Sequence, residues 1–159
     1  MKGLRPTPDR VRETLFNWLG QDLTGRRCLD LFAGSGALGF EAASRGASEV
    51  MMVENNRAAF CALQENSGKL GCTSVALRCE DGLGFARRLD AGRYDVIFLD
   101  PPFDGGYLPE VLPLLAGKLT MGGLVYVETG EVFKPDAAWL MVKSGRAGKV
   151  YYQLLQQAQ

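Results

Sequence analysis

Short apolar runs alternate with amphipathic helical patterns along most of this 159-residue sequence. The runs have the length of strands, and the segments between them carry apolar residues at the i, i+3 and i+4 spacing of a helix face. This alternation predicts strands joined by helices, and therefore a parallel sheet. The expected strands are 28–33, 50–54, 75–79, 94–99 and 124–128, and the expected helices are 8–19, 37–45, 57–70, 83–89 and 107–119.

Three features refine this prediction. Segment 94–99 is apolar on both faces, which is typical of a central strand in a parallel sheet covered by helices. After residue 128 the helical rhythm stops, and segments 139–143 and 149–155 predict a hairpin that closes one sheet edge. Thr7 is expected to cap the first helix, with Pro8 at its first helical position. We therefore expect a doubly wound, mostly parallel α/β fold with a C-terminal antiparallel hairpin.

Composition limits the chemistry that such a fold can carry. The length suits a single domain, 1–159, and 18 basic residues balance 18 acidic ones, so bulk charge attracts neither nucleic acid nor an acidic membrane. The absence of histidine excludes Ser-His-Asp and Cys-His catalysis and His-ligated metals. The four cysteines lack CxxC spacing, and no run approaches the ~18 apolar residues of a membrane span. We expect a cytoplasmic protein with free thiols and without a metal or a membrane partner.

A glycine-rich turn follows the first predicted strand. Gly34, Gly36 and Gly39 form a GxGxxG pattern between strand and helix, where missing side chains allow close backbone approach to a ligand. Glu54, at the end of the second predicted strand, is placed to accept hydrogen bonds from two ribose hydroxyls. Glycines that only permit a tight turn are the alternative, but the paired spacing favours a nucleoside site.

Both NAD and S-adenosylmethionine bind to turns of this kind, and two acidic residues favour the latter. Asp30 precedes Gly34 by four residues, so its carboxylate is expected under the turn, where it would repel a pyrophosphate and attract a cationic methionine moiety. Asp81 follows the third predicted strand and could accept a hydrogen bond from an adenine amino group. An isolated Asp-Gly is more often a plain turn.

The fourth predicted strand ends in Asp100, Pro101, Pro102 and Phe103. The prolines fix φ and hold the residues before them in extended geometry, which aligns carbonyl acceptors beside the Asp100 carboxylate. An exocyclic amino group that donates to Asp100 and to the Pro101 carbonyl would direct its lone pair at a methyl donor, and Phe103 could stack on an extruded base. A strand that simply ends in a proline turn is the alternative.

Four segments together resemble one bacterial family of class I methyltransferases. They are 5–18, 29–42, 100–103 and 145–152. These segments are similar to the 16S rRNA (guanine-N2-)-methyltransferase family, of the small-subunit rRNA methyltransferase D type. The resemblance implies a seven-stranded sheet, S-adenosylmethionine as donor with S-adenosylhomocysteine as product, and a guanine of 16S rRNA as target. It further implies methylation during assembly of the small subunit. We expect a monomer whose partner is 16S rRNA within an assembly particle, with naked RNA as the alternative substrate.

Matched to the family's motifs are Gly34, Gly36, Glu54 and Asp81 as cofactor residues and 100–103 as catalytic residues. With the residues around them, the predicted site residues fall into three groups. The catalytic residues are Asp100, Pro101, Pro102 and Phe103; the cofactor residues are Asp30, Phe32, Gly34, Ser35, Gly36, Glu54, Asn55, Asp81 and Gly82; the RNA-binding residues, within the N-terminal segment 1–20, are Arg5, Thr7 and Arg10. Members of the family usually carry a basic, glycine-rich stretch before the Arg-Pro-Thr element, whereas Arg5 stands almost at the start here. We therefore expect weak binding of an isolated RNA hairpin by this chain.

Other activities are compatible with parts of the pattern. The Asp-Pro-Pro-Phe element also suits methylation of adenine N6 in DNA or of a protein glutamine. An NAD-dependent oxidoreductase would need a substrate-side acid or base, and the sequence offers neither a second domain nor a histidine for it. A folded but inactive fragment without its RNA-binding arm is a further alternative.

Overall fold

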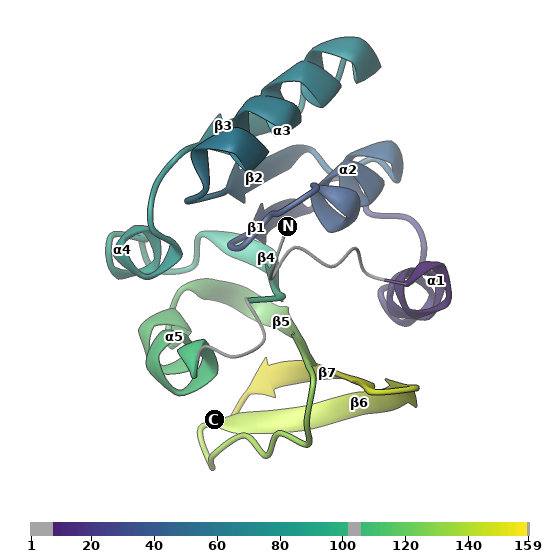
Figure 1. The fold of residues 1–159 in the computed structure, drawn as a ribbon. Helices are drawn as coiled ribbons and strands as arrows, with labels where there is room; N and C mark the ends of the chain where they lie inside the picture. The colour runs from purple at the N-terminus through teal and green to yellow at the C-terminus, as the bar shows by residue number, and fades with distance from the viewer. Residues whose placement is uncertain (1–7, 102–105, 159) are drawn as a thin grey trace.

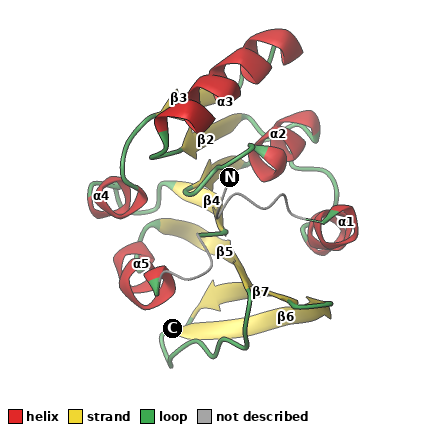
Figure 2. Ribbon diagram, in the orientation of Figure 1, coloured by secondary structure: helices red, strands yellow, loops and turns green. Residues whose placement is uncertain are grey.

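A computed structural model describes residues 8–101 and 106–158 (Figures 1 and 2). Within these residues one sheet has seven strands in the order β3-β2-β1-β4-β5-β7-β6. The strands are β1 Arg27–Asp30, β2 Glu49–Val53, β3 Val75–Arg78, β4 Tyr94–Leu99, β5 Leu119–Thr129, β6 Trp139–Ala147 and β7 Val150–Gln157. The helices are α1 Asp9–Trp18, α2 Ala37–Ser44, α3 Arg57–Leu70, α4 Gly82–Arg87 and α5 Tyr107–Leu115.

The sheet is parallel from β3 to β5, and the hairpin extends it in the antiparallel sense. β7 pairs with β5 and β6 pairs with β7, both antiparallel. Helices α1, α2 and α3 contribute buried side chains to the core on one face of the sheet, and α4 and α5 contribute to the core on the other (Figure 1). The predicted doubly wound fold with a hairpin at one edge is confirmed.

Strand β4 lies between β1 and β5 and contributes side chains to the core on both faces of the sheet. Val96 and Phe98 point into the layer under α1 and α2, while Ile97 and Leu99 point into the layer under α4 and α5. All four side chains are fully buried. Each buried apolar side chain of this size contributes about 1.5–3 kcal/mol, so a strand that is apolar on both faces is stabilised by a position with helices over both faces of the sheet.

Three predicted boundaries are wrong by several residues. β1 ends at Asp30 instead of residue 33, because the chain there bends into the glycine turn. α5 ends at Leu115 instead of residue 119. β5 begins at Leu119 instead of residue 124. Pro113 near the helix end lacks an N–H, and Gly117 adopts a left-handed φ of 79°, so the helix stops and the chain reverses.

The two ends of the described chain also differ from expectation. Pro8 is the N-cap of α1, with a ψ of 143°, rather than its first helical residue. Thr7, the expected capping residue, lies outside the described residues. The hairpin turn is at Gly148, whose φ of 60° is left-handed, so β6 continues through segment 144–147, which was expected to be the connection. In the described part of the chain, no helix combines the length and apolar character needed to cross a bilayer.

Candidate active site

The glycine turn connects β1 to α2 at the carboxyl edge of the sheet. Gly36 is the N-cap of α2 and has a left-handed φ of 84°. A Cβ atom at this position would lie 2.6 Å from both the Leu63 Cδ2 atom and the Phe40 Cε2 atom. Both the backbone conformation and the packing therefore require glycine here.

We expect Gly36→Ala to lower the free energy of unfolding by about 2 kcal/mol, because strain in the left-handed conformation adds to the cost of crowding. Gly20→Ala is the matched control. Gly20 also has a positive φ, 93°, but a Cβ there would meet no atom within 4 Å. Denaturant unfolding of both variants should show the larger loss for Gly36→Ala. Equal losses would assign the whole effect to backbone strain.

Glu54 is hydrogen-bonded directly to the backbone of this turn. Its side chain is 8% exposed, and its Oε1 atom accepts a hydrogen bond of 2.8 Å from the Gly34 N–H. The Oε2 atom accepts a second bond of 2.8 Å from the Asn56 N–H. A carboxylate offers about four acceptor positions, so two backbone bonds fix its orientation and leave capacity for hydroxyl donors. The structure thus brings together the two parts of the predicted nucleoside site.

Asp30 lies beneath the turn, as its spacing suggests, but it is almost completely buried. Its Oδ2 atom accepts a hydrogen bond of 3.2 Å from the Gly39 N–H in the first turn of α2. Burial raises the pKa of Asp30 to about 7; the Gly39 bond opposes this rise, and the nearby Glu54 charge adds to it. At neutral pH the carboxyl group is therefore only partly ionised, and its attraction for a cationic methionine moiety depends on the ionised fraction.

The raised pKa of Asp30 predicts a pH dependence of stability. The ordinary pKa of this carboxyl is 3.8, so the folded state holds the proton more tightly than the unfolded chain does. The free energy of unfolding should fall as pH rises from about 4 to about 7, at up to about 1.4 kcal/mol per pH unit. Asp30→Asn should flatten this decline in a series of denaturant titrations. Parallel pH profiles for the two proteins would show that Asp30 is not the source of this pH dependence.

Phe32 links the turn to the neighbouring strand ends. A Cβ atom at Gly82 would lie 2.9 Å from the Phe32 Cε1 atom and 3.0 Å from the Leu31 carbonyl oxygen, so Gly82 allows this ring to pack closely. The ring also packs against Tyr107 of α5, with ring centroids 5.5 Å apart and a tilt of 56°. Phe32 therefore lies between the predicted cofactor site and the start of α5.

The remaining predicted cofactor residues are more exposed. Asp81 is the N-cap of α4 and accepts a hydrogen bond of 3.1 Å from the Gly84 N–H. This cap is a structural role for Asp81. The contact of Asp81 with adenine stays a prediction. Ser35 and Asn55 are exposed residues that follow Gly34 and Glu54 in their respective loops.

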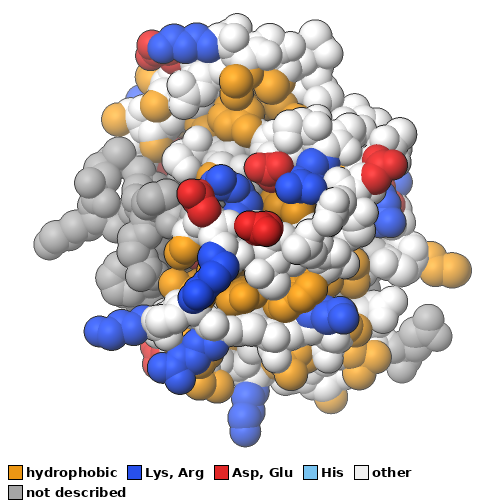
Figure 3. Space-filling model, turned by 90° about the vertical axis from the view of Figure 1, so that its right-hand side faces the viewer, with side chains coloured by type: hydrophobic (Ala, Val, Ile, Leu, Met, Phe, Trp, Pro, Cys, Tyr) orange, Lys and Arg blue, Asp and Glu red, His pale blue; other side chains and the backbone are white. Residues whose placement is uncertain are grey.

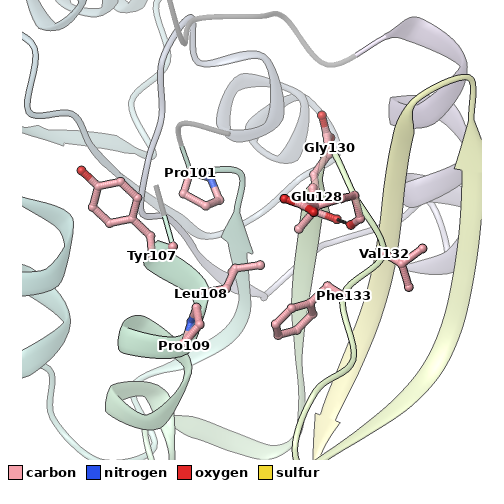
Figure 4. A pocket seen from close by; sticks show the side chains of 11 residues that line it. Pro101, Tyr107, Leu108, Pro109, Glu128, Gly130, Val132 and Phe133 are labelled. Atoms are coloured by element: carbon pink, nitrogen blue, oxygen red, sulfur yellow. Dashed lines mark hydrogen bonds between the residues drawn. The ribbon is translucent and has the colours of Figure 1, made fainter. Parts of the chain in front are cut away.

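A pocket of about 200 Å³ lies between the end of β4, the start of α5 and the segment after β5 (Figure 4). In this view Pro101, which follows β4, stands between Tyr107 on one side and Glu128 on the other. The lining residues are Pro101, Gly106, Tyr107, Leu108, Pro109, Glu128, Thr129, Gly130, Glu131, Val132 and Phe133. Pro101 thus belongs to the wall of a cavity, as an acceptor for an extruded base would.

Glu128 is a pocket residue that the sequence analysis did not assign. Its side chain is only 7% exposed, and the Tyr126 hydroxyl donates a hydrogen bond of 2.7 Å to its Oε1 atom. Leu99 of β4 pairs with Val127 of β5, so Asp100 and Glu128 follow at the same level of two adjacent parallel strands. The sequence did contain a pattern that could have identified Glu128: an acidic residue at the end of an apolar run. The same pattern identified Glu54.

The remaining predicted site residues are Pro102 and Phe103 of the catalytic group and Arg5 and Thr7 of the RNA-binding group, and they lie outside the described residues. Arg10 is exposed on α1. No cluster of three or more metal-ligating side chains occurs in 8–101 or 106–158.

The surface around α1 and α2 carries both signs of charge (Figure 3). Arg12 lies 3.0 Å from an Asp9 carboxylate oxygen and 3.5 Å from one of Glu41, and Arg45 lies 2.9 Å from the other Glu41 oxygen. Ion pairs at a protein surface contribute about 0–1 kcal/mol each. This face is therefore not uniformly basic, in agreement with the balanced overall charge.

A parallel sheet of this strand order, with a glycine turn after β1 and acidic residues at successive strand ends, defines the class I methyltransferase fold. The solved structure of yhhF from Escherichia coli superposes with a TM-score of 0.85 at 39% identity, covering 98% of this chain and 88% of that one. An RNA methyltransferase of Salinibacter ruber in complex with S-adenosyl-L-homocysteine has a TM-score of 0.73 at 18% identity, over 94% and 92% of the two chains. The latter likeness concerns the fold alone.

Sequence comparison identifies the family. Residues 1–156 match the family described as conserved hypothetical protein 95. Ribosomal RNA small subunit methyltransferase D of Haemophilus influenzae is 40% identical over 163 residues, which cover 98% of this chain and 84% of that protein. The Escherichia coli protein of the same name is 40% identical over 159 residues, 97% and 80% of the two chains. The chain belongs to this methyltransferase family, and the resemblance noted from its motifs is confirmed.

Proposed function

We propose that this protein transfers a methyl group from S-adenosylmethionine to the exocyclic N2 amino group of a guanine in 16S rRNA. The observation that carries the proposal is the meeting of two half-sites at one edge of the sheet. Glu54, bonded to the glycine turn, supplies the nucleoside half. Asp100 and Pro101, beside a pocket at the end of β4, supply the acceptor half.

The residues around the glycine turn fit an adenosine-containing cofactor. The Glu54 carboxylate, which accepts hydrogen bonds from the Gly34 and Asn56 N–H groups, is oriented to suit a pair of ribose hydroxyls. Asp81 would hold the adenine side. When bound there, S-adenosylmethionine supplies a methyl group on a positively charged sulfur. The complex of the Salinibacter ruber protein with S-adenosyl-L-homocysteine, on the same fold, supports this choice.

On the acceptor side, Asp100 and Pro101 would orient the target nitrogen. The lone pair of an exocyclic amino group is delocalised into the ring, so the free group is a poor nucleophile. Donation of its two N–H groups to the Asp100 carboxylate and the Pro101 carbonyl directs the lone pair away from the ring plane and toward the donor. As the N–C bond forms and the methyl–sulfur bond breaks, the sulfur would become neutral and the nitrogen positively charged. Asp100 would stabilise that charge until the nitrogen passes a proton to water. Stacking by Phe103 stays a prediction.

The nature of the RNA is inferred from the relatives. Proteins 40% identical to this chain are named for the small ribosomal subunit. We infer that the substrate is 16S rRNA within an assembly particle, and that the protein acts as a monomer with a single domain over residues 1–159. Arg10, exposed on α1, is the described residue that we assign to RNA contact. A particle can supply contacts that the balanced charge of this chain does not.

The decisive experiment is methyl transfer to small-subunit particles isolated from cells that lack the modification. Labelled S-adenosylmethionine should yield N2-methylguanosine in the RNA, identified by nucleoside mass spectrometry. Calorimetry should show binding of S-adenosylhomocysteine and none of NADH. Label in N6-methyladenosine of DNA or in protein glutamine would replace the proposal with one of its alternatives.

A further inference from the structure

Two acidic residues, Asp100 and Glu128, come together where β4 and β5 end. The pairing of Leu99 with Val127 sets them at the same level of adjacent strands, and Glu128 lines the pocket together with Pro101. The proposed function uses only Asp100. We propose that Glu128 is the specificity-determining residue, which selects guanine by accepting a hydrogen bond from its N1–H. The assignment of Glu128 rests on the proposed function, because it presumes an amino group held at Asp100.

The chemistry of the candidate acceptors separates guanine from the others. Adenine N6 and cytosine N4 each lie next to a ring nitrogen with a lone pair, and the amide nitrogen of glutamine lies next to a carbonyl oxygen. Guanine N2 lies next to N1, which carries a hydrogen. An ionised carboxylate only accepts hydrogen bonds, so at this place it attracts the guanine edge and repels the lone pairs of the alternatives.

The orientation of Glu128 is fixed from within the core. Tyr126 is fully buried, and its hydroxyl donates to the Glu128 Oε1 atom at 2.7 Å. Burial and the Glu128 charge raise the pKa of Tyr126 far above its ordinary value, so this hydroxyl keeps its proton and acts as a donor. A carboxylate that is held by a buried donor at the wall of a pocket is preorganised to read a base.

The rest of the pocket suits a flat ring. Leu108 and Phe133 form apolar walls below Pro101 and Glu128 (Figure 4). The Phe133 carbonyl accepts a hydrogen bond of 2.5 Å from the Gln153 side chain, which anchors the segment after β5 to β7. A volume of about 200 Å³ exceeds the ~150 Å³ cavity that is known to admit one benzene ring. The pocket can thus take a flat base beside Glu128 and Pro101, next to the strand end that carries Asp100.

The test replaces the target guanine with 2-aminopurine in reconstituted small-subunit particles. This base keeps the amino group, but its N1 carries a lone pair instead of a hydrogen. Wild-type protein should methylate guanine roughly 100-fold faster than 2-aminopurine, since the wrong base leaves buried polar groups unpaired. Glu128→Gln should narrow the ratio to under about tenfold, because the glutamine amide can donate to N1. Glu110→Gln, which removes a charge from the exposed start of α5, is the control and should keep the wild-type ratio.

Tyr126→Phe provides a second variant, which keeps the Glu128 carboxylate and removes the hydroxyl that holds it. We expect an intermediate ratio, with the affinity for S-adenosylhomocysteine unchanged in both variants. An unchanged ratio in Glu128→Gln, or an equal loss of rate on both bases, would overturn the role of Glu128 while leaving N2 methylation by the wild type intact. Absence of N2-methylguanosine in wild-type reactions would instead overturn the proposed function.

Discussion

Asp100→Asn is expected to lower the turnover of methyl transfer roughly 100- to 1000-fold, the loss typical of removing one electrostatic contact to a transition state. Asparagine keeps the shape and one acceptor oxygen but loses the negative charge. That charge matters most when the target nitrogen becomes positive, as the N–C bond forms. The affinity for S-adenosylhomocysteine should stay the same, because Asp100 acts on the acceptor and not on the donor.

Single-turnover kinetics on particles lacking the modification measure this effect. Asp90→Asn is the matched control: Asp90 is exposed and precedes β4, at the opposite end of the strand from Asp100. It should react at the wild-type rate. A wild-type rate in Asp100→Asn would show that position 100 only orients the amino group and that the charge is dispensable.

The bounds of helix α3 and strand β4 were predicted to the residue, because local sequence signals determine them. Helix α3 begins after Asn56, whose side chain accepts a hydrogen bond from the Ala59 N–H, and it ends before Gly71 with its left-handed φ of 64°. Both signals stand in the sequence as a capping residue and a terminal glycine. β4, bounded as expected, is apolar on both faces, a pattern that only a central strand accommodates.

Some features that depend on the exact register between distant segments were not predicted. The early start of β5 at Leu119 follows from its pairing with Tyr94, which lies in another strand. Glu128 became a site residue only through the register that sets it beside Asp100. Likewise, the spacing of Asp30 predicted its place under the turn, but its raised pKa arises from burial by the whole core, which a linear pattern does not contain.

Glu54→Ala is expected to weaken the binding of S-adenosylhomocysteine by about 2–3 kcal/mol, roughly 30- to 150-fold in affinity, because a charge-assisted contact to two hydroxyls is lost. Calorimetry measures the affinity directly. Glu49→Ala is the matched control, since Glu49 stands at the amino end of the same strand and forms an ion pair with Arg93. Its removal should leave the affinity unchanged.

A second ligand separates contact with the ribose from support of the turn, because Glu54 also holds the N–H groups of Gly34 and Asn56. A 2′,3′-dideoxy analogue of S-adenosylhomocysteine lacks the hydroxyls that Glu54 is proposed to bind. Wild-type protein should bind this analogue about as weakly as Glu54→Ala binds the normal ligand, and the variant should hardly distinguish the two ligands. If the variant still preferred the hydroxylated ligand by the wild-type factor, the two effects would be additive and therefore independent. Glu54 would then act only by holding the glycine turn, and another group would bind the ribose.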